Sequence, residues 1–179
     1  RNVGRGLGAP LEPEDCGVQW MPDVSPMRWH LAHTTWFFET FVLKTFVPRY
    51  EPANPAFEYL FNSYYNTVGQ QYPRSKRGLL SRPTVAEVLD YRRCVDEGMQ
   101  RLLDDPPPEV ADIIRIVEIG LQHEQQHQEL MLTDIKHVFS CNPLYPVYQP
   151  AAERNATEER KLGWTEYAEG LYEIGHAGE

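Results

Sequence analysis

Two histidines spaced four residues apart are the part of this sequence best suited to chemistry. His123 and His127 lie in LQHEQQHQEL, which contains the pattern His-Glu-x-x-His. On an α-helix, residues four apart differ by about 40° in azimuth, so both imidazoles would project toward one point. Imidazole is a good ligand for zinc, iron, copper and nickel. The spacing therefore predicts one helix that supplies two ligands to a single metal ion.

Zinc peptidases use the same spacing, but they need a third ligand further along the chain. Leu130 and Thr133 occupy the positions at which the longer metzincin motif has glycine and histidine. Downstream glutamates such as Glu153 and Glu158 fall in a segment that we expect to be a linker. No strand that could bind a peptide is expected before the motif. These features argue against a peptidase.

An upstream segment offers the alternative third ligand. His30 and His33 stand in WHLAHTTWFFE, in which they are surrounded by tryptophan and phenylalanine. Histidines in such apolar surroundings are either hydrogen-bonded core residues or metal ligands. The two differ by about 60° around a helix, so we expect only one of them to reach the ion. Periodicity alone does not choose between them.

The sequence predicts four helices that would position these residues. Ser25-Pro26 fits an N-cap followed by the first helical residue, and Thr84 with Glu87 fits a capping box. The expected helices span residues 25–47, 56–69, 84–103 and 109–139. Four helices with modest connections predict a mainly α fold, an up-and-down bundle over residues 1–142.

The character of the sequence changes after the fourth helix. Residues 143–163 are rich in proline and charge and are expected to form a linker. Residues 164–179 show glycines and short apolar alternation, which favours the first strand of a second, truncated domain.

The composition narrows the classes of partner. The chain has 179 residues and a formal net charge of −9, so nucleic acid and anionic membranes would repel it at long range. No apolar run approaches the roughly 20 residues of a membrane span. The three cysteines form no Cys-x-x-Cys pair, which favours a reducing compartment. We therefore expect a cytoplasmic protein that acts on small molecules, with neither nucleic acid nor membrane as partner.

Three blocks of the sequence carry a family resemblance. SPMRWHLAHTTWFFETF, NSYYNTVGQQYPRSKRGLLSRP and HEQQHQELMLTDIKH resemble the N-terminal, DinB-like domain of the ergothioneine-biosynthesis sulfoxide synthases. GWTEYAEGLYEIGH resembles the start of that family's second domain, an α+β domain similar to formylglycine-generating enzymes (sulfatase-modifying factors). The resemblance implies a non-haem Fe(II) site formed by His33, His123 and His127, with His30 as a neighbour.

The same resemblance implies an O2-dependent oxidoreductase. Its substrates would be hercynine (trimethylhistidine), O2 and a thiol, either cysteine or γ-glutamylcysteine. The sulfur would bond to the imidazole C2 carbon and leave as a sulfoxide. The chain's own C-terminal domain would complete the site.

Five further residues are candidates for contact with the substrates. The resemblance assigns Gln126 to hercynine, although it could instead be a solvated polar residue. Tyr64 and Tyr65 are candidates for hydrogen bonding to substrate or for proton delivery, and one of them is expected to pack instead. Arg74 and Arg77 could grip the carboxylate of the thiol substrate, or belong to a solvated loop.

Other functions remain open from the sequence. A DinB-like thiol transferase would use a similar three-histidine metal without oxygen. A related branch acts on histidine itself, as a 5-histidylcysteine sulfoxide synthase that makes ovothiol precursors. A metal-binding or interaction domain without catalysis is the third class.

Overall fold

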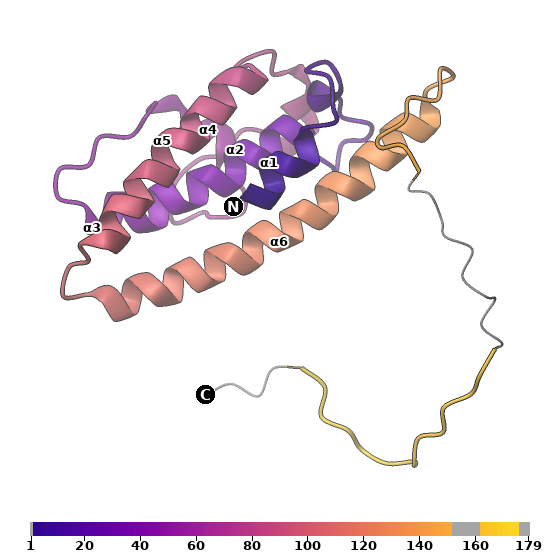
Figure 1. Cartoon of the computed structure of the whole chain (residues 1–179). Coiled ribbons are helices and arrows are strands. Elements are labelled where there is room, and N and C mark those ends of the chain that lie inside the picture. The colour runs from indigo at the N-terminus through magenta and orange to yellow at the C-terminus, as the bar shows by residue number, and fades with distance from the viewer. Residues whose placement is uncertain (1, 152–161, 176–179) are drawn as a thin grey trace. The chain divides into compact units, whose positions relative to one another are not determined.

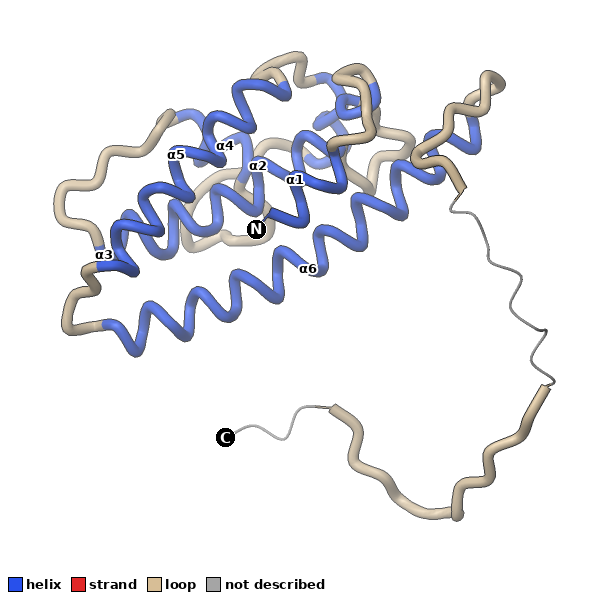
Figure 2. Tube along the Cα trace, viewed as in Figure 1, coloured by secondary structure: helices blue, strands red, loops and turns tan. Residues whose placement is uncertain are grey.

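The computed structural model describes residues 2–151 and 162–175, and its regular secondary structure is helical throughout those ranges (Figures 1 and 2). Chain contacts group Arg1–Gln149 as one compact unit and Pro150–Glu179 as another. The prediction of a mainly α fold is confirmed. Among the described helices, none has both the length and the apolar character needed to cross a membrane.

All helical elements of the described residues lie in the first unit. The α-helices are α1 (Asn2–Gly8), α2 (Met27–Phe38), α3 (Lys44–Phe46), α4 (Ala56–Phe61), α5 (Val85–Asp104) and α6 (Val110–Cys141). Two 3-10 helices, η1 (Asp15–Gly17) and η3 (Arg74–Leu79), and one π-helix, η2 (Glu39–Leu43), complete the list. The predicted first, third and fourth helices are found as α2–η2–α3, α5 and α6. Helix α1 was not predicted.

Helix α2 forms the centre of this unit. Eleven of its twelve residues are buried, so other parts of the unit surround this helix on nearly every side. Figure 1 shows α2 flanked by α5 and α6, and it also contacts α4 and α1. Any side chain of α2 that serves as a metal ligand is therefore held in place by its neighbours.

Helix α5 begins as the sequence predicts. The side chain of Thr84 accepts a hydrogen bond from the backbone N–H of Glu87 at 3.2 Å, and the Glu87 carboxylate accepts one from the N–H of Thr84 at 2.6 Å. These reciprocal bonds satisfy backbone donors that the first helical turn leaves free. One face of the helix then buries Val88, Tyr91 and Val95, and the helix packs against α2 and η2.

The predicted second helix ends early. Helix α4 stops at Phe61, and residues 62–73 are irregular, so the prediction of helix to residue 69 is wrong. The side-chain amide of Asn62 donates to the carbonyls of Tyr65 at 3.2 Å and Gly69 at 3.0 Å. Asparagine often competes with helix in this way, by hydrogen bonding to nearby backbone. Tyr64, with φ of 64°, stands in the left-handed region.

The predicted start of an α+β domain is not found either. Residues 162–175 contain no strand, although the sequence favoured one there. A strand needs a partner for its backbone groups, and short apolar alternation supplies none by itself. Residues 152–161 of the predicted linker and 176–179 of the predicted domain lie outside the described residues.

Candidate metal centre

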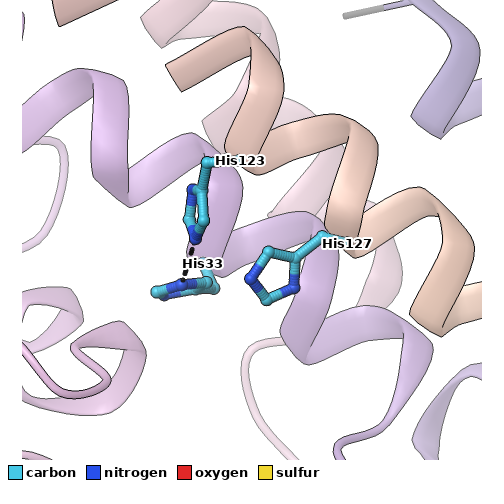
Figure 3. A group of neighbouring side chains, drawn as sticks. All are labelled: His33, His123 and His127. Atoms are coloured by element: carbon cyan, nitrogen blue, oxygen red, sulfur yellow. Dashed lines mark hydrogen bonds between the residues drawn. The ribbon is translucent and has the colours of Figure 1, made fainter. Parts of the chain in front are cut away.

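Three histidines from two helices meet in the interior of the first unit. His33 comes from the middle of α2, and His123 and His127 from adjacent turns of α6 (Figure 3). One ring nitrogen from each lies within 4.8 Å of the other two. The Nε2 atoms of His33 and His123 are 3.1 Å apart. Two nitrogens about 2.1 Å from one ion and at right angles to each other would be about 3 Å apart, so the spacing suits ligands on one face of an ion.

The orientation of His33 is fixed by its neighbours. Its Nδ1 lies 2.6 Å from the backbone carbonyl oxygen of Phe61, at the end of α4, to which it donates a hydrogen bond. The ring is stacked on Trp29, with centroids 4.6 Å apart, and faces Trp36 on its other side at 5.6 Å. A proton on Nδ1 leaves the lone pair on Nε2, which is the nitrogen that faces His123. The end of α4 at Phe61 therefore supplies the carbonyl oxygen that orients the His33 ring.

All three imidazoles are held in the neutral form. Burial lowers the pKa of His123 to about 4 and the pKa of His33 well below its usual value. Burial, and then the charges of His30, His33 and His123, also lower the pKa of His127. A neutral imidazole keeps the lone pair that a metal ion needs. At neutral pH no proton competes for these nitrogens.

The donor set itself indicates which kind of ion fits. Three imidazole nitrogens without a carboxylate suit a transition-metal ion and do not suit calcium or magnesium, which prefer oxygen ligands. Within the described part of the chain, Nδ1 of His123 is buried and has no hydrogen-bond partner, so no protein group ties this ring to another orientation. The three residues therefore fit a transition-metal ion.

Glu124 does not face the histidines. Its carboxylate is 2% exposed and pairs with the guanidinium of Arg92, which is fully buried on α5. Nη1 of Arg92 also donates to the hydroxyls of Thr34 and Thr35 on α2, each at 3.2 Å. The glutamate that a peptidase would use as a base is instead part of a polar cluster that joins three helices.

Gly120 lets α6 approach α2 one turn before the first ligand of α6. A Cβ atom added there would lie 2.7 Å from Cζ of Phe38 and 2.8 Å from Cε1 of Phe37, both ring atoms in the core. Such distances require the helices or the rings to move. The absence of a side chain at this position therefore sets the separation of the two ligand-bearing helices.

We expect Gly120→Ala to weaken metal binding although it removes no ligand, because separating α6 from α2 moves His123 away from His33. Overpacking of a core typically costs about 1–3 kcal/mol, so stability should fall as well. Gly6→Ala in α1 is the matched control, since a Cβ there meets nothing within 4 Å. Isothermal titration with Co(II) measures the effect. Equal affinities of the two variants would contradict this role for Gly120.

A cavity of about 400 Å³ opens beside the three histidines. Its lining includes every residue that the sequence singled out for substrate contact: Tyr64, Tyr65, Arg74, Arg77 and Gln126. The structure thus brings all eight predicted site residues to one place. It also adds Ser25 and Ser63, which the sequence gave no reason to select.

Arg77 is the buried cation of this cavity. Its side chain is 2% exposed, its guanidinium lies 3.4 Å from the ring centroid of Trp29, and it donates to the hydroxyls of Ser25 at 2.9 Å and Ser63 at 3.1 Å. Burial lowers its pKa to about 9, so it still carries charge at neutral pH. No carboxylate forms an ion pair with it among the described residues. A buried positive charge without a counter-ion favours an anionic ligand.

The two tyrosines occupy different environments, although both follow the end of α4 and neither lies on a helix. Tyr65 is half-buried, and its ring lies 5.0 Å from Phe41 and 5.6 Å from Trp36, between centroids. Tyr64 is 73% exposed, and the guanidinium of Arg74 lies 4.7 Å from its ring centroid. Tyr65 therefore packs against the core while Tyr64 stands at the edge of the cavity.

Comparison with known protein families gave a match for most of the first unit. Residues 4–131 match the model of a family described as the DinB superfamily. The matched span covers more than half of the chain and includes all three histidines. The comparison with curated proteins gave no match.

Proposed function

This chain belongs to the DinB superfamily, and from that premise we propose that it is an Fe(II)-dependent sulfoxide synthase that joins a thiol to hercynine. The observation that carries the proposal is the set of three neutral histidines, with no carboxylate among them, beside a cavity that contains a buried arginine. Three protein ligands on one face leave positions open for substrates. A substrate thiolate would contribute the negative charge that the protein ligands lack.

The chain's own residues bind and orient the substrates. Arg77, helped by Arg74, holds the carboxylate of cysteine or γ-glutamylcysteine, because a guanidinium forms two parallel hydrogen bonds to a carboxylate. Gln126, next to His127 on α6, offers an amide to hercynine. Tyr64 and Tyr65 are close enough to the same cavity to donate a proton during oxygen reduction. Bound Fe(II) would supply the activation of O2, which no side chain provides.

The reaction balances without another reductant. The thiol loses its hydrogen, C2 of the hercynine imidazole loses its hydrogen, and a carbon–sulfur bond forms between them. One oxygen atom of O2 becomes the sulfoxide oxygen, and the other leaves as water with the two hydrogens. The substrates supply all four electrons that O2 takes up.

The family match leaves a second function open. The match to the DinB superfamily over residues 4–131 names no reaction. A thiol transferase could use the same three histidines to activate a thiol with zinc. An ovothiol-type synthase would use the same oxygen chemistry on histidine in place of hercynine.

Oxygen uptake by the Fe(II)-loaded chain tests the proposal. With hercynine and cysteine, we expect one O2 consumed per product, and a product mass equal to both substrates plus one oxygen atom minus two hydrogens. Replacing cysteine with γ-glutamylcysteine, or hercynine with histidine, identifies the preferred pair by mass spectrometry. Full turnover of the zinc-loaded chain without oxygen consumption would contradict the synthase and support the transferase.

A further inference from the structure

We infer that His30 and Asp134 are positioning residues that set the proton on His127 and so aim its other nitrogen at the metal ion. His127 on α6 contacts His30 on α2, and His30 in turn contacts Asp134 on α6. We call these contacts the relay. This inference rests on the metal centre of the proposed function, and it is independent of oxygen chemistry and of the identity of the substrates.

His30 is placed against a ligand rather than merely near it. Its side chain is 3% exposed, and its Nδ1 lies 2.7 Å from Nδ1 of His127. That distance is a hydrogen bond, so exactly one of the two nitrogens must carry the proton. On the other side of the ring, Nε2 of His30 lies 3.6 Å from Oδ2 of Asp134.

Asp134 is itself held in place. Its other oxygen, Oδ1, accepts a hydrogen bond from Nε1 of Trp20 at 3.2 Å. Within the described residues, Nε2 of His30 is buried and has no hydrogen-bond partner, and the carboxylate of Asp134 is the charged group that lies 3.6 Å from it. A buried N–H that faces an anion is stabilised, whereas a buried lone pair that faces one is repelled. The carboxylate therefore favours the tautomer of His30 with its proton on Nε2.

This tautomer of His30 determines which nitrogen of His127 carries the proton. With the proton of His30 on Nε2, its Nδ1 can only accept, and His127 must donate from Nδ1. The lone pair of His127 then resides on Nε2, which is the nitrogen left to bind an ion. The reverse arrangement would protonate Nε2 of His127 and prevent it from acting as a ligand. One hydrogen bond, between His127 and His30, and one charge contact of 3.6 Å, between His30 and Asp134, thus connect a carboxylate to the metal site.

The three ligands differ in what orients them. His33 donates to a backbone carbonyl, and Nδ1 of His123 has no partner among the described residues. His127 alone in the described chain is connected to a carboxylate, through His30. Hydrogen bonds from ligand histidines to such outer groups fix the ring and raise its basicity, and their loss typically weakens metal binding about 10–100-fold.

Two substitutions of similar size separate positioning from packing. Leucine at position 30 cannot accept a hydrogen bond, whereas asparagine can present Oδ1 near the position of the lost Nδ1. We expect His30→Leu to weaken Co(II) binding about 10–100-fold and His30→Asn to weaken it clearly less. Titration of the metal-free chain with Co(II), followed by its visible absorption, measures both. Equal Co(II) affinities of the two variants, with equal thermal stability, would show that His30 only fills space and would overturn the inference.

A double-mutant cycle tests whether Asp134 acts through His30. Asp134→Asn removes the negative charge but keeps an acceptor for Trp20, and Asp134 is partly exposed, at 14%, so the variant should fold. We expect it to weaken Co(II) binding several-fold in the parent chain and to have no effect in the His30→Leu chain. The same fold-change in both backgrounds would overturn the relay.

A different set of binding results would be expected if the three histidines did not bind a metal ion at all. His33→Ala serves as the reference, because it removes a ligand from α2 and leaves both residues of the relay intact. Undiminished Co(II) binding by His33→Ala would refute the metal centre itself. Abolished binding by His33→Ala, together with unchanged binding by His30→Leu, would refute the relay alone.

Discussion

Replacing His33 with alanine should lower the affinity of the chain for Fe(II) or Co(II) by more than about 100-fold. Loss of an outer-shell partner alone weakens metal binding by about 10–100-fold, and a ligand contributes more than its partner does. His123→Ala and His127→Ala should have effects of the same order, because each leaves only two nitrogens of the cluster. Competition against a coloured chelator measures such affinities in the absence of any substrate.

His137→Ala is the matched control for these ligand deletions. His137 lies on α6 with two of the ligands, but its ring packs against Trp20, with centroids 3.9 Å apart, and it is not in the cluster. Its replacement removes no nitrogen of the cluster and no residue of the relay, so the metal affinity should stay within about two-fold of the parent. If all four alanine variants bound the ion equally well, the three histidines would not be its ligands.

Replacing Arg92 with methionine should lower the free energy of unfolding by about 3–5 kcal/mol. Glu124 would then keep its charge in the interior without the guanidinium that neutralises it, and the hydroxyls of Thr34 and Thr35 would lose a donor. Breaking one side of a buried ion pair is among the most destabilising single changes. Urea unfolding of the metal-free chain gives the value directly.

Two further variants identify the cause of this loss. Arg92→Met combined with Glu124→Leu should recover part of the stability, because the second change removes the buried carboxylate that has lost the Arg92 guanidinium. Arg93→Met, at the neighbouring position of α5, should leave the free energy of unfolding close to that of the parent, since Arg93 is 57% exposed and pairs only at the surface. Equal destabilisation by Arg92→Met and Arg93→Met would show that the buried pair contributes nothing special.

Local signals explain why so much of the helical fold could be predicted. The capping box at Thr84 and Glu87 marks the start of α5 through bonds within one turn, and the spacing of His123 and His127 depends only on helical geometry. The position of these two rings side by side follows from the same geometry. Such features need no knowledge of the rest of the chain.

Features that depend on distant contacts were not predictable in the same way. The early end of α4 depends on the amide of Asn62, which bonds to a loop that closes only in the folded chain. Likewise, the importance of Arg77 comes from Trp29, Ser25 and Ser63, which are remote in sequence. The family resemblance implied that His30 is a neighbour of the site, but its 2.7 Å contact with His127 depends on how α2 and α6 pack.

Because the ligands come from two distant segments of the chain, a bound ion would stabilise the folded protein. His33 and His123 are 90 residues apart in the chain, so an ion held by both would close a long loop, much as a covalent cross-link does. An ion present at 100 times its dissociation constant adds about 2.7 kcal/mol to the stability of the form that binds it. The melting temperature of the protein would then rise with the concentration of the ion, and chains without a bound ion would be degraded first.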